Sequence, residues 1–165
     1  RYEPETGELF WLSRHKNLFA TEQSAMTWNA RFAGVRAFTA LNNCGYRRGT
    51  IWGQTYLAHR VIWALVMGYW PHELIDHING DKTDNRWNNL RCATQAENLR
   101  NQGTRSDNTS GFKGVSWKKR LRRWQANIRV SGVQMHLGYF DDAEEAHAAY
   151  VAAAEKHYGK FARAA

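Results

Sequence analysis

The sequence predicts an α+β protein built in two parts. Short apolar runs between turn residues predict strands through much of the chain, and two longer segments have helical periodicity. Between the parts, residues 101–111 (NQGTRSDNTSG) contain no apolar side chain and have the composition of a linker. The hydrophobic content of 43% over 165 residues suffices for a core in each part. The predicted ranges are 1–58, 59–102, 103–110 (the linker) and 111–165.

The chain is strongly basic. Its formal net charge of +8 and isoelectric point of about 9.8 indicate a polyanionic partner, either nucleic acid or an anionic membrane. No apolar run approaches the roughly 20 residues that span a bilayer, so nucleic acid is favoured and no membrane is expected. Cys44 and Cys92 form no CxxC pair, which argues against a zinc knuckle or a disulfide framework. A reducing, intracellular and cytoplasmic setting fits this pattern.

Residues 1–58 are predicted to be β-rich. A Thr6-Gly7 turn separates YEPE from ELFWL, and the short runs VRAFTA, GTIW and TYLA follow, divided by turn residues. No catalytic pattern occurs here, and we expect this segment to pack on the part that follows it.

Residues 59–71, HRVIWALVMGYWP, predict a buried helix. Apolar residues occupy it almost all round, and Gly68 and Pro71 mark its end. His59 and Arg60 at its start suit helix capping and packing, with a phosphate contact as the alternative.

The stretch after this helix is rich in polar residues. Residues 75–90, IDHINGDKTDNRWNNL, hold aspartates, asparagines and a histidine with only isolated apolar residues between them. A core strand cannot bury so many polar groups without partners, so they belong on a loop or around a ligand. For Asn79, Asp81, Asp84 and Asn85 we expect turn chemistry, in which the side chain caps its own backbone.

Asp76 and His77 have the chemistry for cutting a phosphodiester. That reaction needs a base that takes a proton from water and a cation that neutralises the phosphate. The two residues end a predicted strand, so one side chain can hold a metal while the other faces a water. Thr94 and Glu97 have the spacing of a capping box, which puts the Asn98 amide in the first turn of a helix. Since Mg²⁺ accepts one carboxylate and one amide oxygen, Asp76 and Asn98 are its candidate ligands.

Residues 55–102, including HRVIW and IDHINGDKTDNRWNNLRCATQAENLRN, resemble the HNH endonucleases of phage and homing type. The DH pair, the two asparagines before Leu90 and the EN pair at the helix start stand at that family's spacing. The resemblance implies a ββα-metal fold that grips the DNA minor groove and cleaves with one divalent ion, Mg²⁺ or another such as Mn²⁺.

The same resemblance implies roles for four residues. His77 would be the general base, and Asn89 would orient it through its amide. Asp76 and Asn98 would bind the metal. Bracing of the loop by Asn89, and a plain helix-surface position for Asn98, are the alternatives.

Residues 111–165 predict three strands and one helix. GVSWKK, RWQANIRV and QMHLGYF alternate with period two, and DDAEEAHAAYVAAAEKHYGKFA follows with acids in its first turn and an alanine-rich face. The sheet face towards the helix is expected to carry Val115, Trp117, Trp124, Ala126, Ile128, Met135 and Leu137. The uncovered face is expected to carry Lys113, Ser116, Lys118, Gln125, Asn127, Arg129, Gln134 and His136.

The uncovered face and the turn beside it predict a DNA-binding surface. Amides pair with adenine in the major groove, and cations pair with guanine or with phosphate. Residues 118–123, KKRLRR, add five cations in six residues, which predicts phosphate contacts and strong salt dependence. The residues expected at DNA are Lys113, Lys118, Lys119, Arg120, Arg122, Arg123, Gln125, Asn127, Arg129 and His136.

Residues 111–161 also resemble the Apetala-type DNA-binding domain, through GFKGVSWKK, HLGYF and EEAHAAY. Ser116 and His136 depart from the arginine and tryptophan that are common in that family. The residues that the resemblance places at DNA are Lys113, Lys118, Asn127, Arg129 and His136.

Together these features predict a metal-dependent DNA endonuclease whose C-terminal part locates a site on double-stranded DNA. A homing endonuclease is one form that this prediction allows. The alternatives are a DNA-binding regulator with a disused nuclease fold and, from the basic sheet alone, an RNA-binding module. No cofactor beyond the metal is expected. If the protein is phage-encoded, its setting is the bacterial host cell.

Overall fold

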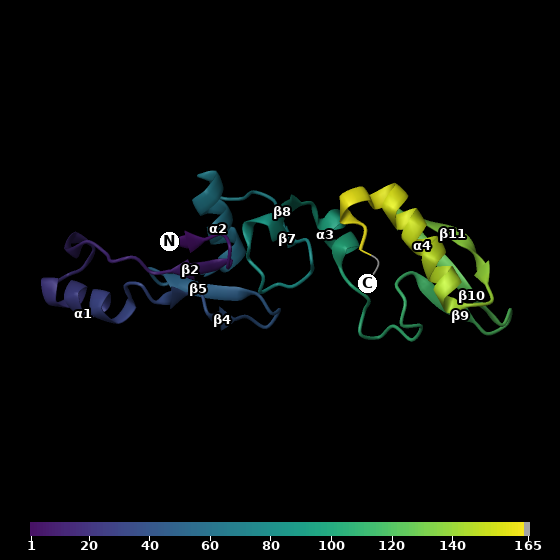
Figure 1. The fold of residues 1–165 in the computed structure, drawn as a ribbon, viewed down its shortest axis with the longest axis horizontal. Coiled ribbons are helices and arrows are strands. Elements are labelled where there is room, and N and C mark those ends of the chain that lie inside the picture. Colours follow the sequence, from purple (N-terminus) through teal and green to yellow (C-terminus); the bar gives the residue numbers. More distant parts are fainter. Residues whose placement is uncertain (164–165) are drawn as a thin grey trace. The chain divides into compact units, whose positions relative to one another are not determined.

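The computed structural model describes residues 1–163 and divides into two compact units, residues 1–92 and the residues from Ala93 onward. The last two residues of the predicted range 111–165 lie outside the described part. The first unit combines three small sheets with helices and the second combines one small sheet with helices, which confirms the predicted α+β class (Figure 1). None of the described helices is long and apolar enough to cross a membrane.

The strands before Ala93 form three small sheets. The first contains β1 (Tyr2–Glu3), β2 (Glu8–Phe10) and β3 (Arg36–Ala37), and the second contains β4 (Ala40–Leu41), β5 (Arg47–Ile51) and β6 (Gln54–Leu57). The third pairs β7 (Leu74–His77) with β8 (Leu90–Ala93). The hairpin between β1 and β2 turns at Gly7, as the Thr6-Gly7 signal predicted, with a φ of +73° that favours glycine.

The first unit also contains a helix, α1 (Glu22–Phe32), which the β-rich prediction for residues 1–58 missed. A 3-10 turn, η1 (Lys16–Leu18), precedes it. Thr21 caps α1 by accepting a hydrogen bond from the backbone N–H of Ser24 at 3.1 Å. Ala25 is the one buried residue of α1, so this helix has almost no apolar stripe for periodicity to detect. The threonine cap followed by an acid was the signal available in the sequence.

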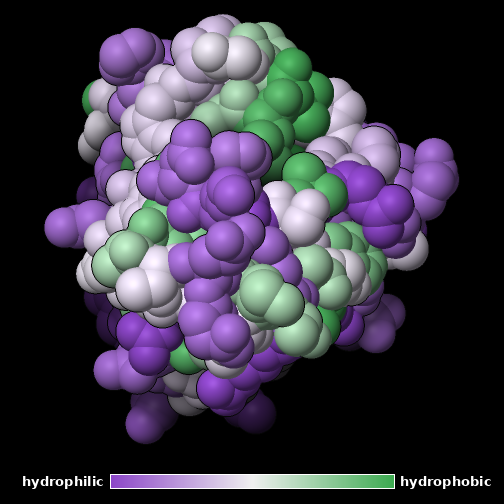
Figure 2. Space-filling view, turned by 90° about the vertical axis from the view of Figure 1, so that its left-hand side faces the viewer, coloured by the Kyte–Doolittle hydropathy of each residue, from purple (hydrophilic) through white to green (hydrophobic). Residues whose placement is uncertain are grey.

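Helix α2 (Ala58–Met67) confirms the helix predicted at residues 59–71, and it ends at Gly68 in the left-handed conformation. The prediction that it is buried all round is wrong, because Leu65 is 57% exposed and Val66 and Met67 are also exposed. Figure 2 shows hydrophobic residues gathered in the upper part of one face, beside hydrophilic ones. The helix therefore buries one side only, and its buried residues are Ala58, His59, Ile62 and Trp63.

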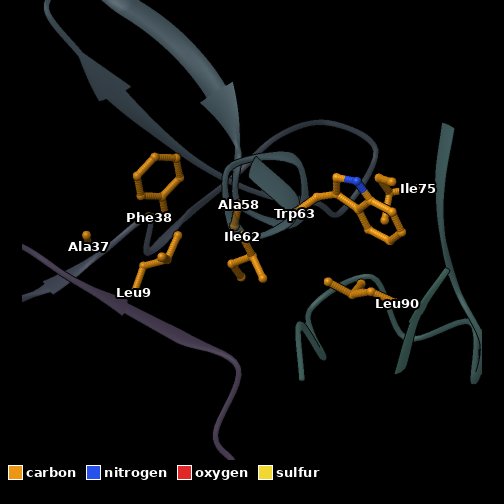
Figure 3. Close-up of a cluster of buried hydrophobic side chains, with 8 residues drawn as sticks. All are labelled: Leu9, Ala37, Phe38, Ala58, Ile62, Trp63, Ile75 and Leu90. Atoms are coloured by element: carbon orange, nitrogen blue, oxygen red, sulfur yellow. The ribbon is translucent and has the colours of Figure 1, made fainter. Parts of the chain in front are cut away.

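One hydrophobic cluster joins the N-terminal strands to the polar stretch. Leu9 of β2 and Phe38 lie on one side of α2, and Ile75 of β7 and Leu90 of β8 lie on the other (Figure 3). Ile62 of α2, with no exposed surface, packs between them. Burial of such side chains contributes about 1.5–3 kcal/mol each. The hairpin of residues 2–10 and the strand that ends at His77 thus share one core.

The second unit contains the three predicted strands and the predicted helix. The antiparallel sheet has the order β11-β10-β9, with β9 (Val115–Lys118), β10 (Arg123–Val130) and β11 (Val133–Phe140). Helix α4 (Ala143–Tyr158) begins at an Asp142 cap and is followed by a 3-10 turn, η3 (Gly159–Phe161). Helix α3 (Gln95–Asn101) begins with the predicted capping box of Thr94 and Glu97.

Most of the predicted helix-facing residues of this sheet are buried or half-buried, and two are not. Trp117 is 44% exposed and Met135 is 39% exposed. Both lie on edge strands, whereas the buried Ala126 and Ile128 lie on the central strand β10. A single helix covers the middle of a three-stranded sheet better than its edges, because a helix is about 10 Å wide.

Helix α3 belongs to the second unit, so the division falls before the predicted linker at 103–110. The Lys113 ammonium donates to the carbonyls of Arg100 at 2.7 Å and Gln102 at 2.6 Å. The Arg100 guanidinium lies 4.9 Å from the Tyr158 ring centre. These contacts tie the last turn of α3 to the sheet and helix that follow it.

Candidate active site and nucleic-acid interface

Asp76 and His77 end strand β7, as predicted, and both are buried, with 4% and 3% of their surface exposed. Successive strand residues point to opposite faces, so the two side chains have different neighbours. The carboxylate of Asp76 accepts from the guanidinium of Arg91 on β8, with Nε and Nη2 both 2.8 Å from Oδ2. Arg91 was not among the predicted site residues, because only strand pairing brings it opposite Asp76.

The imidazole of His77 is paired with the side chain of Asn85. Nε2 of His77 lies 3.1 Å from Oδ1 of Asn85, and Nδ2 of Asn85 donates to the carbonyl of Thr83 at 3.3 Å. The second contact fixes which end of the amide faces the ring. An amide oxygen only accepts, so Nε2 of His77 carries the proton and Nδ1 carries the lone pair. This is the tautomer that a general base acting through Nδ1 requires.

The amide of Asn89 is bound within the loop after β7. It donates to Oδ1 of Asn79 at 3.0 Å and to the carbonyl of Asp84 at 2.7 Å. Its Oδ1 accepts from the backbone N–H of Asn79 at 2.9 Å. Asn89 therefore braces the loop, which is the alternative expected from the sequence, and a role in orienting His77 stays a prediction. The amide that lies against the imidazole is that of Asn85.

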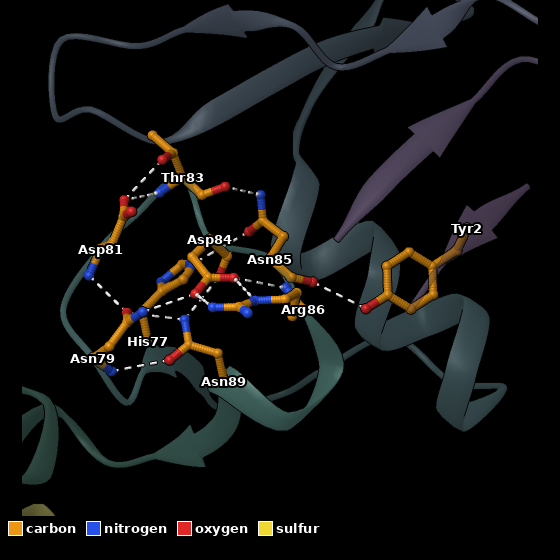
Figure 4. A network of polar contacts seen from close by, with 9 residues as sticks. All are labelled: Tyr2, His77, Asn79, Asp81, Thr83, Asp84, Asn85, Arg86 and Asn89. Atoms are coloured by element: carbon orange, nitrogen blue, oxygen red, sulfur yellow. Dashed lines mark hydrogen bonds and ion pairs between the residues drawn. The ribbon is translucent and has the colours of Figure 1, made fainter. Parts of the chain in front are cut away.

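The loop of residues 78–86 is closed by its own polar side chains (Figure 4). Asp81 accepts from the backbone and hydroxyl of Thr83, both at 2.8 Å, which is the expected turn chemistry. Asp84 accepts from Arg86 at 2.8 and 2.6 Å, and hydrogen bonds from Arg86 lower the pKa of that carboxyl to about 2. Asn85 differs from these turn residues, since it is 1% exposed and its amide points inward.

Two aromatic side chains enclose the imidazole of His77. The His59 ring lies edge-on at 5.1 Å and the Tyr46 ring lies at 5.8 Å, both between ring centres. Burial, and to a smaller extent the positive charge that His77 can carry, lower the pKa of His59 to about 3. Burial also lowers the pKa of His77, although the bond to Asn85 and the charge of Asp76 oppose that shift. Both rings are therefore neutral near pH 7. His59 packs within the unit, as expected, but it does not cap α2, whose N-cap residue is Leu57.

The fourth predicted residue, Asn98, lies on α3, where its backbone N–H donates to the carbonyl of Thr94 at 3.0 Å. Since α3 belongs to the second unit, a shared metal site of Asn98 and Asp76 stays a prediction. Among the described residues, no group of three or more His, Cys, Asp and Glu side chains is arranged to hold a metal.

The sheet of the second unit has a polar face on the side away from α4. Asn127 pairs across the strands with His136, and Arg129 pairs with Gln134. Gln125 pairs with Tyr139, which was not predicted, and its amide lies 3.0 Å from Nδ1 of His136. The turn between β9 and β10 adds a group of exposed cations: Lys118, Lys119, Arg120, Arg122 and Arg123.

Two of the cations predicted to contact DNA, Lys113 and Arg123, have partners inside the protein. The ammonium of Lys113 is half-buried on the carbonyls that it holds, and burial lowers its pKa to about 8. It is therefore not displayed on the polar face. Arg123 forms two hydrogen bonds with Asp141, at 2.7 and 2.8 Å, which offset part of its charge.

Comparison with known proteins points to the same segment. Residues 56–100 match the HNH endonuclease family. The chain is 36% identical over 106 residues to Protein 3.8 of Escherichia phage T7. The matched region covers 64% of this chain and 87% of that protein. It is also 31% identical over 106 residues to an uncharacterized HNH endonuclease of Acanthamoeba polyphaga mimivirus. That matched region covers 63% of this chain but only 54% of the mimivirus protein. No solved structure matches the chain.

Proposed function

The chain belongs to the same family as Protein 3.8 of Escherichia phage T7 and contains an HNH endonuclease domain, and from this premise we propose that it is a metal-dependent DNA endonuclease. Its substrate would be double-stranded DNA, its reaction the hydrolysis of a phosphodiester bond, and its setting the host cell of a phage. The observation that carries the proposal is the buried His77–Asn85 pair beside Asp76.

In the proposed reaction, Nδ1 of His77 takes a proton from a water molecule as the water oxygen attacks phosphorus. A new P–O bond forms, and the bond to the leaving 3′-oxygen breaks with its electron pair on that oxygen. Asn85 keeps the proton of Nε2 in place, so the charge that develops on the ring is held by the amide oxygen. A positioned base of this kind contributes about 10²- to 10⁴-fold in rate.

The donor set around Asp76 suits a hard cation such as Mg²⁺ or Mn²⁺ in an open site. Asp76 would supply a buried carboxylate, which also pairs with Arg91, and Asn98 is the predicted second ligand. Few protein ligands are what Mg²⁺ requires, because it keeps several waters. The bound cation would supply charge stabilisation at the phosphate and at the leaving oxygen.

We assign the location of the target site to the second unit. Its polar face presents amides and cations in the alternating pattern of a strand, and the turn at 118–123 presents cations for phosphate. Gln125, Asn127, Arg129 and His136 would read bases or sugar-phosphate there. The homing type of endonuclease and the Apetala-type likeness of this unit are part of the same proposal.

A plasmid cleavage assay tests the proposal. Supercoiled DNA should be nicked or linearised with Mg²⁺ or Mn²⁺ and left intact with a chelator. His77→Ala should lose about 10²- to 10⁴-fold in cleavage while keeping its DNA affinity within a few-fold. His72→Ala is the matched control, because His72 is an exposed histidine on the loop before β7. DNA binding without cleavage by the unaltered chain would favour a non-catalytic DNA-binding regulator.

A further inference from the structure

The hairpin of residues 2–10 touches the loop that carries Asn85, although more than seventy residues separate them in the sequence. The Tyr2 hydroxyl donates to the backbone carbonyl of Asn85 at 3.0 Å (Figure 4). Burial raises the pKa of that hydroxyl, so it stays a donor across the physiological range. The carbonyl that accepts this bond belongs to the peptide that joins Asn85 to Arg86, and the backbone of Trp87 also interacts with the hydroxyl.

The turn of the same hairpin closes on the same peptide. A Cβ built on Gly7 would lie 2.5 Å from the Arg86 nitrogen and 2.6 Å from the Asn85 carbonyl carbon. Such distances are far below van der Waals contact, and both neighbours are backbone that cannot swing away. Gly7 also has a φ of +73°, which side-chain-bearing residues rarely adopt. This approach therefore requires glycine.

The Asn85–Arg86 peptide is thus held from several directions. Tyr2 holds its carbonyl, Gly7 packs against its backbone, and Oδ1 of Asp84 accepts from the Arg86 N–H at 3.3 Å. Leu9 anchors the hairpin in the same hydrophobic cluster as Ile75, one residue before Asp76. The hairpin contacts the backbone of Asn85, and the imidazole of His77 contacts the side chain of the same residue.

We propose that Tyr2 and Gly7 are positioning residues of the nuclease site, which act through Asn85 to hold the imidazole of His77 in its catalytic orientation and tautomer. This inference rests on the proposed nuclease function. It gives the segment before residue 59, where the sequence shows no catalytic pattern, a direct part in the reaction. The physical basis is that a displacement of about 1 Å at a reacting group can cost on the order of 10²-fold in rate.

Tyr2→Phe in the full chain is the test variant, because it removes one hydroxyl and keeps the ring. We expect kcat for DNA cleavage to fall about 3- to 10-fold, the worth of one hydrogen bond, with KM for DNA unchanged. Tyr69→Phe, at an exposed tyrosine after α2, is the matched control and should leave both constants unchanged. A rise in KM with unchanged kcat would overturn the proposal, since it would make Tyr2 a DNA contact.

A double-mutant cycle separates positioning from a general loss of packing. Asn85→Ala removes the amide through which Tyr2 is proposed to act, so Tyr2→Phe should cost little further in kcat on that background. An equal fold-loss from Tyr2→Phe on both backgrounds would overturn the proposal. Gly7→Ala should reduce kcat more than Tyr2→Phe does, because it pushes the hairpin off the loop.

The tautomer of His77, read from ¹⁵N shifts of its ring, provides a measurement that needs no activity. The unaltered chain should carry its proton on Nε2, and Tyr2→Phe should increase the share of the Nδ1–H form. An unchanged tautomer together with unchanged kcat would overturn the inference. If the unaltered chain cleaves no DNA, the proposed function fails, and the tautomer comparison still decides whether the hairpin positions the ring.

Discussion

Arg91 and Asp76 form a buried ion pair across the β7–β8 sheet, with Nε and Nη2 of the arginine both 2.8 Å from one carboxylate oxygen. Their side chains are 11% and 5% exposed. For a pair this buried, the main energetic effect is that removal of one partner leaves the other charge buried and uncompensated, which destabilises the fold. The carboxylate nearest to the proposed base is therefore already balanced by a cation of the protein.

Arg91→Ala should destabilise the first unit by about 3–5 kcal/mol, because it leaves the charge of Asp76 buried without that partner. Urea unfolding measures the loss. If Asp76 binds a divalent cation, added Mg²⁺ should raise the Tm of Arg91→Ala more than that of the unaltered chain, since the ion replaces the missing charge. The double variant Asp76→Asn with Arg91→Ala is the control and should lose this response. An equal Mg²⁺ effect in all three proteins would exclude Asp76 as a ligand.

Asn85→Ala and Asn89→Ala should differ in their effects on kcat and Tm, although each removes one amide and the two positions are only four residues apart. Asn85→Ala should lower kcat far more than Asn89→Ala does, because its amide oxygen serves His77. Its Tm should also fall, since the side chain is buried. Asn89→Ala should lower Tm by several degrees, because its amide closes the loop through Asn79 and Asp84. Thermal unfolding and single-turnover cleavage on the same preparations distinguish them. The reverse pattern would restore Asn89 as the residue that orients the base.

Cleavage should rise as the pH is raised and then level off, because a base must be neutral to accept a proton. Burial lowers the pKa of His77 below its ordinary value, so the midpoint should lie below pH 6.5. The bond to Asn85 opposes this shift, and Asn85→Ala should therefore move the midpoint lower still. Single-turnover rates between pH 5 and 8 at saturating metal give the midpoint. A midpoint above pH 6.5 would contradict the burial that the fold gives this ring.

The first unit should lose stability as the pH falls from 6.5 towards 3. The folded chain holds His59 neutral down to a pKa of about 3, whereas in the unfolded chain the same ring binds a proton near the ordinary histidine pKa of 6.5. Between these values the unfolded state binds more protons, so acid favours unfolding, by up to a few kcal/mol in total. His59→Phe keeps a ring beside Tyr46 and His77 and should flatten this part of the pH dependence. Urea midpoints compared at pH 7 and pH 5 provide the measurement.

Substitutions of Lys113 and Arg129 should affect different properties: the first should lower stability, and the second should weaken DNA binding. Arg129→Ala should weaken binding to the specific site by about 1–3 kcal/mol if the guanidinium reads a base. Lys113→Met should lower the Tm of the second unit, because the ammonium holds carbonyls at the end of α3, and should leave the DNA affinity of the folded protein within a few-fold. A large loss of affinity in Lys113→Met without a loss of Tm would return Lys113 to the DNA surface.

The sequence by itself determined the parts of the molecule whose signals are local. Alternation with period two predicted β9, β10 and β11, and the acids and alanines after them predicted α4. The capping box at Thr94 and Glu97 lies within four residues of chain, and the glycine ends of α2 and the first hairpin are equally local. The sequence also singled out Asp76 and His77, since a polar pair at the end of an apolar strand requires partners.

Only the tertiary structure decided which side chains meet. Residues 79–89 offer four amides with the same chemistry, those of Asn79, Asn85, Asn88 and Asn89, and no local rule says which one reaches His77. Arg91 finds Asp76 because β7 and β8 pair, and Lys113 turns inward because α3 packs on its own unit. Tyr2 meets Asn85 only because one core joins the first hairpin to β7. The physical reason is that periodicity and capping report on interactions within a turn or two of chain, whereas an active site is assembled by contacts between distant segments, whose energies depend on packing that no single segment contains.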